Sequence, residues 1–231
     1  MDVAREVVSA HYRYLTLQLH LTTSLALADA QFIAVKRASQ KSSVSPSLMA
    51  RICSSAADHL SAAQGILASC PTKRELDDDL VSYVSQDREL AQATVYRWMG
   101  NTADKAGNVG ESIGCINLSI SILKKLKTSK LPSIASRAKT EFAIAEELAR
   151  NWIKYNDSVA FEPVLDSASV QDRVPSGREA LAMKQFQTPK LKFGDFVDDG
   201  DFNERISGLR IDDHDSSDEE TRNYAGKGSY Y

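Results

Sequence analysis

Between Arg13 and Lys36 the sequence carries a single charged side chain, that of Asp29. Apolar residues in this segment recur at steps of three and four, the spacing of one continuous stripe along an α-helix. The stripe consists of Tyr14, Leu17, Leu21, Leu25, Ala28, Phe32 and Val35, and a second flank of Leu15, Leu19, Ala26 and Ile33. A helix that is apolar on most sides is typically buried on most sides. We therefore expect a central helix over about 2–39, with neighbouring helices on both flanks.

Four further segments show helical periodicity, and short breaks separate them. These segments are about 46–69, 73–106, 109–128 and 132–156. Pro46 and Pro132 stand where a first helical turn tolerates proline, and Gly107 and Gly110 bracket the break between the third and fourth segments. Consecutive helices joined by short connections favour antiparallel neighbours. The sequence therefore predicts an all-α fold, an antiparallel array of helical hairpins.

The character of the chain changes after Asn156. Residues 157–194 hold three prolines among scattered apolar residues, which predicts an extended strap laid along the helices. Residues 195–231 carry 4 basic and 11 acidic side chains, a net charge of −7, whereas the rest of the chain carries +4. We expect a helical domain over 1–194 and a disordered acidic tail over 195–231.

Composition argues against several classes of function. The net charge of −3 and the pI of about 5.8 disfavour binding to nucleic acid. The three cysteines are scattered along the chain, at Cys53, Cys70 and Cys115. This spacing argues against a disulfide framework and a thiolate zinc site, and it favours a reducing compartment. No histidine stands at a metal-ligand spacing, and no glycine-rich phosphate loop or nucleophile elbow occurs. We expect no cofactor, no small-molecule substrate and no enzymatic activity; an enzyme would need a convergent polar site.

A group of lysines stands at the end of the fourth predicted helix: Lys124, Lys125, Lys127 and Lys130. Cations at a helix C-terminus interact favourably with the helix dipole and keep the surface soluble. The alternative interpretation is a patch that binds an anionic membrane or an acidic partner.

Ser216 and Ser217 stand in the acidic sequence SSDEE of the predicted tail. Acidic residues that follow a serine suit an acidophilic kinase, and phosphorylation would deepen the negative charge of the tail. We regard both serines as candidate phosphorylation sites, with an unmodified, solvated tail as the alternative.

Several segments, taken together, resemble the BRO domain family. They are 27–38 (LADAQFIAVKRA), 48–52 (LMARI), 56–58 (AAD), 109–116 (VGESIGCI), 156–157 (ND) and 174–180 (VPSGREA). The first three are similar to the central helical hairpin of that family and the last to its closing strap. In order and spacing the resemblance covers about 15–194. Because BRO domains begin with a β-containing lobe and further helices, it also implies that the N-terminal part of a complete domain is missing.

The resemblance implies a non-enzymatic adaptor. BRO domains are helical scaffolds that bind the C-terminal amphipathic helix of the core ESCRT-III subunit and so dock on endosomal or plasma membrane. The ending of the chain looks most like the palC-type pH-response regulators, a fungal branch that acts in ambient (alkaline) pH signalling. We therefore expect a cytoplasmic protein that is recruited peripherally to membrane. A helical scaffold subunit, or another BRO-type endosomal sorting adaptor, is the alternative.

The partner groove of the family aligns with Ala34, Arg37, Leu48, Arg51 and Ile52. Leu48 and Ile52 match two aliphatic positions of that groove, and Arg37 matches a basic one. Arg51 replaces a lysine of the family, and Ala34 replaces an aromatic residue. Leu48 and Ile52 are i, i+4 neighbours, which a partner helix can read as a ridge. The alternative is that both are ordinary core residues.

Overall fold

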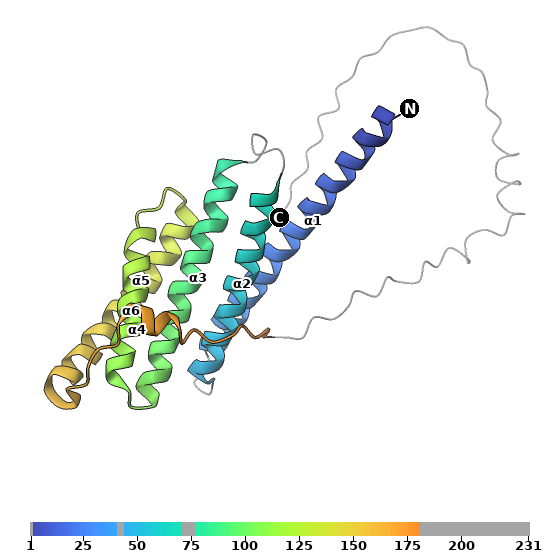
Figure 1. Ribbon diagram of the computed structural model, residues 1–231. Helices are drawn as coiled ribbons and strands as arrows, with labels where there is room; N and C mark the ends of the chain where they lie inside the picture. Colours follow the sequence, from blue (N-terminus) through green and yellow to red (C-terminus); the bar gives the residue numbers. More distant parts are fainter. Residues whose placement is uncertain (1, 41–43, 71–76, 181–231) are drawn as a thin grey trace, which may run out of the picture. The chain divides into compact units, whose positions relative to one another are not determined.

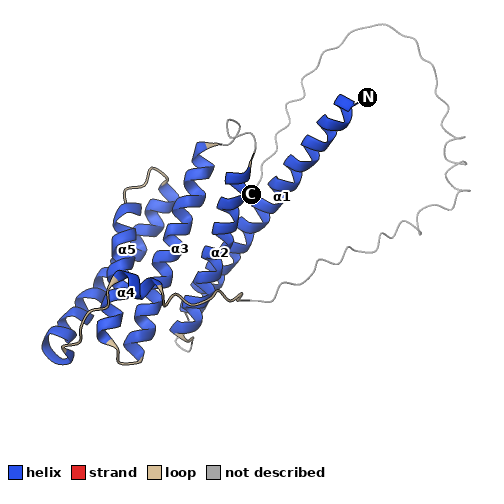
Figure 2. Ribbon diagram, in the orientation of Figure 1, coloured by secondary structure: helices blue, strands red, loops and turns tan. Residues whose placement is uncertain are grey.

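The computed structural model describes three stretches of the chain, 2–40, 44–70 and 77–180, with side chains from Leu15 onwards. Throughout these stretches the regular elements are helices, and none of their residues is in a strand (Figure 2). The predicted all-α fold is confirmed. The predicted tail, with Ser216 and Ser217, and the last part of the predicted strap lie outside the described residues.

Five long helices follow one another as a series of hairpins (Figure 1). They are α1 (Asp2–Ser39), α2 (Pro46–Ser69), α3 (Asp78–Lys105), α4 (Val109–Leu126) and α5 (Pro132–Tyr155). Each packs on the next in chain order, and α5 also contacts α3. A π-helical turn (Asn156–Ala160) and a short helix, α6 (Ser167–Gln171), follow.

The start of α3 differs from the sequence-based prediction. Asp77 has an extended backbone, with φ −65° and ψ 120°, and its side chain accepts a hydrogen bond from the backbone N–H of Asp79 at 2.9 Å. This is the geometry of an N-cap, so the helix begins at Asp78 and not near residue 73. Asp78 and Asp79 then lie in the first turn, where negative charge complements the helix dipole.

Two apolar clusters form most of the core. One lies between α3, α4 and α5 and includes Leu90, Ile116 and Trp152. The other joins α1, α2, α3, α4 and α6, and it includes Cys53 and Cys115. Burial raises the pKa of both thiols to about 12, so these cysteines are neutral apolar packing groups at ordinary pH.

The prediction that the first helix is central is wrong within the described part of the chain. Among the described helices, α2 is the one whose backbone lies close to that of α1. The flank with Leu15, Leu19 and Ile33 is 48%, 64% and 56% exposed, whereas Ala28 and Val35 are buried. Periodicity identifies which residues could be buried together, but an apolar flank is covered only if another element reaches it.

The segment after α5 is less extended than predicted. It contains the π-helical turn and α6, which Asp166 caps by accepting a hydrogen bond from the Ser169 N–H at 2.7 Å. Val170 of α6 is fully buried. The chain then crosses over the helices and reaches α2 in an extended form (Figure 1). Five residues make α6 too short for a periodic pattern to reveal.

Candidate functional site

The five predicted partner-binding residues come from two adjacent helices, the last turns of α1 and the first turns of α2. Ala34 and Leu48 are half-buried and Arg37 is exposed. Ile52 is 5% exposed and lies inside the second core cluster, while Leu48 packs on the margin of that cluster. The structure therefore places these residues in one region, but Leu48 and Ile52 do not form an exposed ridge.

The strap covers part of this region. We call residues 174–180 the strap end. The N–H of Arg178 donates to the carbonyl oxygen of Arg51 at 2.9 Å, and Arg51 Nε donates to the carbonyl oxygen of Ser176 at 3.4 Å. One turn further along α2, the Ser54 hydroxyl donates to the carbonyl oxygen of Pro175 at 2.8 Å.

A carboxylate at the strap end joins α1 to α2. Glu179 Oε1 lies 2.9 Å from His59 Nε2 of α2, and its Oε2 accepts from Gln31 Nε2 of α1 at 3.0 Å. Gln31 in turn accepts from the N–H of Ala180 at 2.9 Å and is 4% exposed. Sequence reasoning missed Gln31 and Glu179. The available signal was the amide of Gln31, a polar group in the segment 14–35, where Asp29 is the one charged residue.

Gly177 allows the close approach of the strap end to α2. A Cβ atom at this position would lie 2.8 Å from Ser55 Cα, 2.9 Å from Ser55 N and 2.5 Å from Asp58 Oδ2. Because backbone atoms of a helix cannot move aside, only glycine fits here without displacing the strap.

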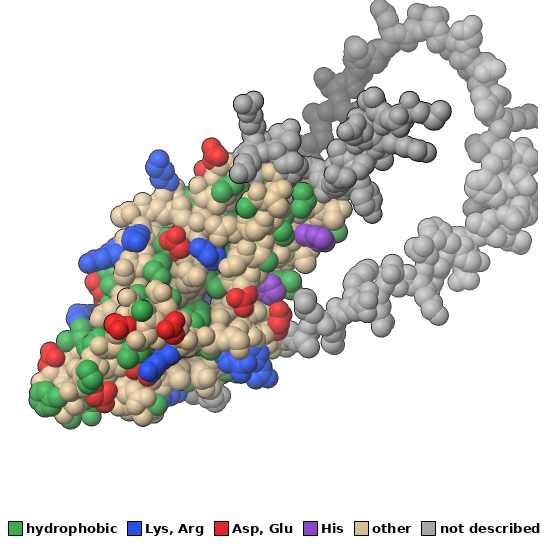
Figure 3. All heavy atoms as spheres, in the orientation of Figure 1, with side chains coloured by type: hydrophobic (Ala, Val, Ile, Leu, Met, Phe, Trp, Pro, Cys, Tyr) green, Lys and Arg blue, Asp and Glu red, His purple; other side chains and the backbone are tan. Residues whose placement is uncertain are grey.

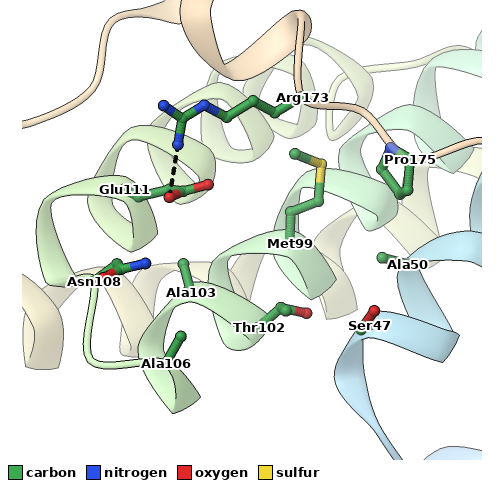
Figure 4. A pocket seen from close by; sticks show the side chains of 10 residues that line it. All are labelled: Ser47, Ala50, Met99, Thr102, Ala103, Ala106, Asn108, Glu111, Arg173 and Pro175. Atoms are coloured by element: carbon green, nitrogen blue, oxygen red, sulfur yellow. Dashed lines mark hydrogen bonds and ion pairs between the residues drawn. The ribbon is translucent and has the colours of Figure 1, made fainter.

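Two shallow hollows lie beside this region. The first, of about 220 Å³, is enclosed by α2, α3, α4 and the strap, and the Glu111–Arg173 ion pair, 2.8 Å long, stands at its edge (Figure 4). Met99 points toward the strap in this view. The second, of about 240 Å³, is lined by residues that include Val44, Met49 and Trp98. Both hollows have mixed linings. The first also includes Ser47, Thr102 and Asn108, and the second also includes Asn101, Asp104 and Lys105.

The buried charged groups serve to hold helices together. Arg137 Nη1 lies 2.6 Å from Asp87 Oδ1, and Arg97 Nε lies 2.7 Å from Glu141 Oε2, so both pairs link α3 to α5. Burial raises the pKa of Asp87, and Arg137 partly offsets this. Among the described residues, no group of three or more His, Cys, Asp and Glu side chains could hold a metal ion.

The lysine cluster lies at the opposite end of α4 from the Glu111–Arg173 pair. Lys124, Lys125 and Lys130 are exposed. Lys127 instead places its Nζ 3.6 Å from the centre of the Phe142 ring, a cation–π contact within the fold. On the face shown in Figure 3, basic and acidic side chains are interspersed. None of the described helices has the length and apolar character needed to cross a membrane.

Comparisons with known proteins agree with this architecture. The family model of the BRO1-like domain matches residues 14–193. The pH-response regulator protein palC of Cryptococcus neoformans var. neoformans serotype D (strain B-3501A) is 27% identical, over 68% of this chain and 36% of its own. The protein of the same name from Yarrowia lipolytica (strain CLIB 122 / E 150) is 24% identical, over 67% of this chain and 31% of its own. The chain thus spans about a third of the length of these relatives, and it belongs to the BRO1-like domain family.

Proposed function

We propose that this chain is a non-enzymatic adaptor in ambient-pH signalling, and that it binds the C-terminal amphipathic helix of the core ESCRT-III subunit. The observation that carries the proposal is the family match over residues 14–193, joined with the similarity to two pH-response regulators. The helical scaffold, in which α1 and α2 bring the five predicted partner-binding residues into one region, supports a binding role.

The proposed contact surface is the margin where α1 meets α2. Leu48 and Ala34 supply a half-buried apolar edge, and Arg37 supplies an exposed cation beside it. An amphipathic helix that carries acidic residues next to its apolar face is complementary to such a surface. Ile52 lies beneath this edge, so we propose that it supports Leu48 from the core side.

We further propose that the protein is cytoplasmic and is recruited peripherally to endosomal or plasma membrane. Besides the ESCRT-III subunit, an anionic lipid surface is a candidate ligand for the three exposed lysines at the end of α4, namely Lys124, Lys125 and Lys130. Lys127 would contribute less because its ammonium group already lies over Phe142.

Calorimetric titration of the full chain with a synthetic ESCRT-III C-terminal helix tests the proposal. We expect Leu48→Asp to weaken binding by roughly 30-fold, the effect of a central contact worth about 2 kcal/mol. Arg37→Glu should weaken binding at low salt and less so at high salt, because the arginine is exposed. Lys139→Glu, an exposed change of the same charge on α5, is the matched control and should leave the affinity unaltered.

Two results would count against the proposal. The proposed function would be rejected if neither the wild type nor any variant binds the helix, including the variants that loosen the strap end. Unchanged affinity in a folded Leu48→Asp variant would reject the proposed contact surface but not the adaptor function. Circular dichroism of each variant establishes that the helices are intact.

A further inference from the structure

We infer that the strap end is a removable cover that competes with the partner for the margin between α1 and α2. This inference rests on the proposed function, because it concerns the same surface. It assigns an inhibitory role to residues 174–180, in which the chain itself occupies part of the site until the partner displaces it.

The first step of the argument is overlap. Arg51, a predicted partner-binding residue, already bonds to the strap end through both its carbonyl oxygen and its guanidinium group. Ala180 packs against the core cluster that contains Ile52 and that Leu48 borders. A partner helix that engages Arg51 would therefore have to displace Ser176 and Arg178, and one that packs on the cluster at Ala180 would have to displace that residue.

The second step is that the strap end can leave without unfolding the core. Val170 of α6 is fully buried and anchors the strap upstream. Beyond it, Ser176, Gly177 and Arg178 are exposed, and Pro175, Glu179 and Ala180 are only half-buried. Hydrogen bonds and the partial burial of residues such as Ala180 hold this segment, and none of residues 174–180 is fully buried, so its local opening costs far less than global unfolding.

The third step is that the contact is specific. Glu179 bonds to two different helices through His59 and Gln31, and Gly177 lies where any side chain would strike the backbone of α2. A segment that merely lay on the surface would need neither feature. The Glu179 carboxylate therefore acts as a latch, in the sense that its two hydrogen bonds fasten the strap end to α1 and α2. Gly177 allows the strap end to lie close against the backbone of α2.

Two variants of the full chain test the inference. Glu179→Ala removes both latch bonds, and Gly177→Ala pushes the strap end off α2 while keeping the carboxylate. For each we expect hydrogen exchange of the 174–180 amides to accelerate at least 10-fold, and affinity for the synthetic ESCRT-III helix to rise at least 5-fold. Asp172→Ala, an exposed acidic residue of the same strap, is the matched control and should change neither quantity.

The outcomes separate this inference from the proposed function. Faster exchange with unaltered affinity in both variants overturns the cover while leaving the adaptor in place. Exchange that stays slow in both variants overturns the latch. Binding by the two variants but not by the wild type supports the cover most directly. Failure of all chains to bind, with exchange accelerated as expected, rejects the proposed partner.

Discussion

At the scale of single residues, Phe161 has the most unusual backbone conformation in the described part of the chain. Its φ of 52° lies in the left-handed region, which a bulky side chain rarely adopts. Asn156 holds it there: its carbonyl oxygen accepts from the Phe161 N–H at 2.9 Å, and its side-chain amide bonds to both backbone groups of Glu162. Phe161 is 73% exposed, so burial of its ring does little to offset the cost of this backbone conformation.

Phe161→Gly should therefore raise the free energy of unfolding by about 0.5–1 kcal/mol. Left-handed backbone costs a non-glycine residue roughly 1–2 kcal/mol, and the extra entropy of glycine in the unfolded chain offsets only part of that. Phe161→Ala keeps the strain and separates it from loss of the ring. Urea unfolding followed by circular dichroism measures both. A glycine variant less stable than the alanine variant would contradict this account.

At the scale of elements, the two flanks of α1 lie in different environments. Ile33 is 56% exposed, whereas Val35, two residues later, is 7% exposed and packs in the cluster that contains Met49. We expect Ile33→Lys to change the free energy of unfolding by no more than about 0.5 kcal/mol, and Val35→Lys to cost about 2–4 kcal/mol.

Lysine forms helices better than isoleucine or valine, so helix propensity cannot explain such a difference. Urea unfolding midpoints of the two variants provide the measurement. Similar costs at both positions would mean that α1 is covered on both flanks, as the sequence pattern predicts.

At the scale of the whole described fold, one ion pair with a buried carboxylate connects three helices. Asp87 of α3 is 1% exposed and pairs with Arg137 of α5, whose guanidinium lies 4.7 Å from the ring centre of Phe32 on α1. Arg137→Met would leave the carboxylate buried without its cation, which typically costs about 3–5 kcal/mol. The double variant Asp87→Leu, Arg137→Met should recover most of that loss.

The loss should depend on pH in a defined direction. Burial already raises the pKa of Asp87 above its ordinary value, and removal of Arg137 raises it further. The folded variant therefore holds its proton in a pH range where the unfolded chain releases it. As pH rises through this range, its free energy of unfolding falls, so the deficit should shrink toward acidic pH. Arg173→Met, which breaks an ion pair whose arginine side chain is 52% exposed, should cost less than about 1 kcal/mol at any pH.

Sequence reasoning was most successful where the governing interactions are local. The limits of α1, α2, α4 and α5 lie within two residues of those predicted, because helical spacing and first-turn prolines such as Pro46 and Pro132 act over one or two turns. The start of α3 was missed because its N-cap, Asp77, belongs to a run of three aspartates in which no periodicity marks the first helical residue. Placing Ala34, Arg37 and Leu48 near one another likewise needed only the hairpin of α1 and α2.

The helical class, the order of the helices and the family could all be predicted from the sequence. These depend on the spacing of side chains and on short motifs, which are properties of neighbouring residues. Tertiary structure alone decided that Ile52 is in the core while Leu48 lies at its margin, and that one flank of α1 is uncovered. It also brought Glu179 to Gln31, 148 positions away in the chain. Such outcomes depend on which segment, distant in the sequence, packs on a given surface, and a local sequence pattern does not specify that packing.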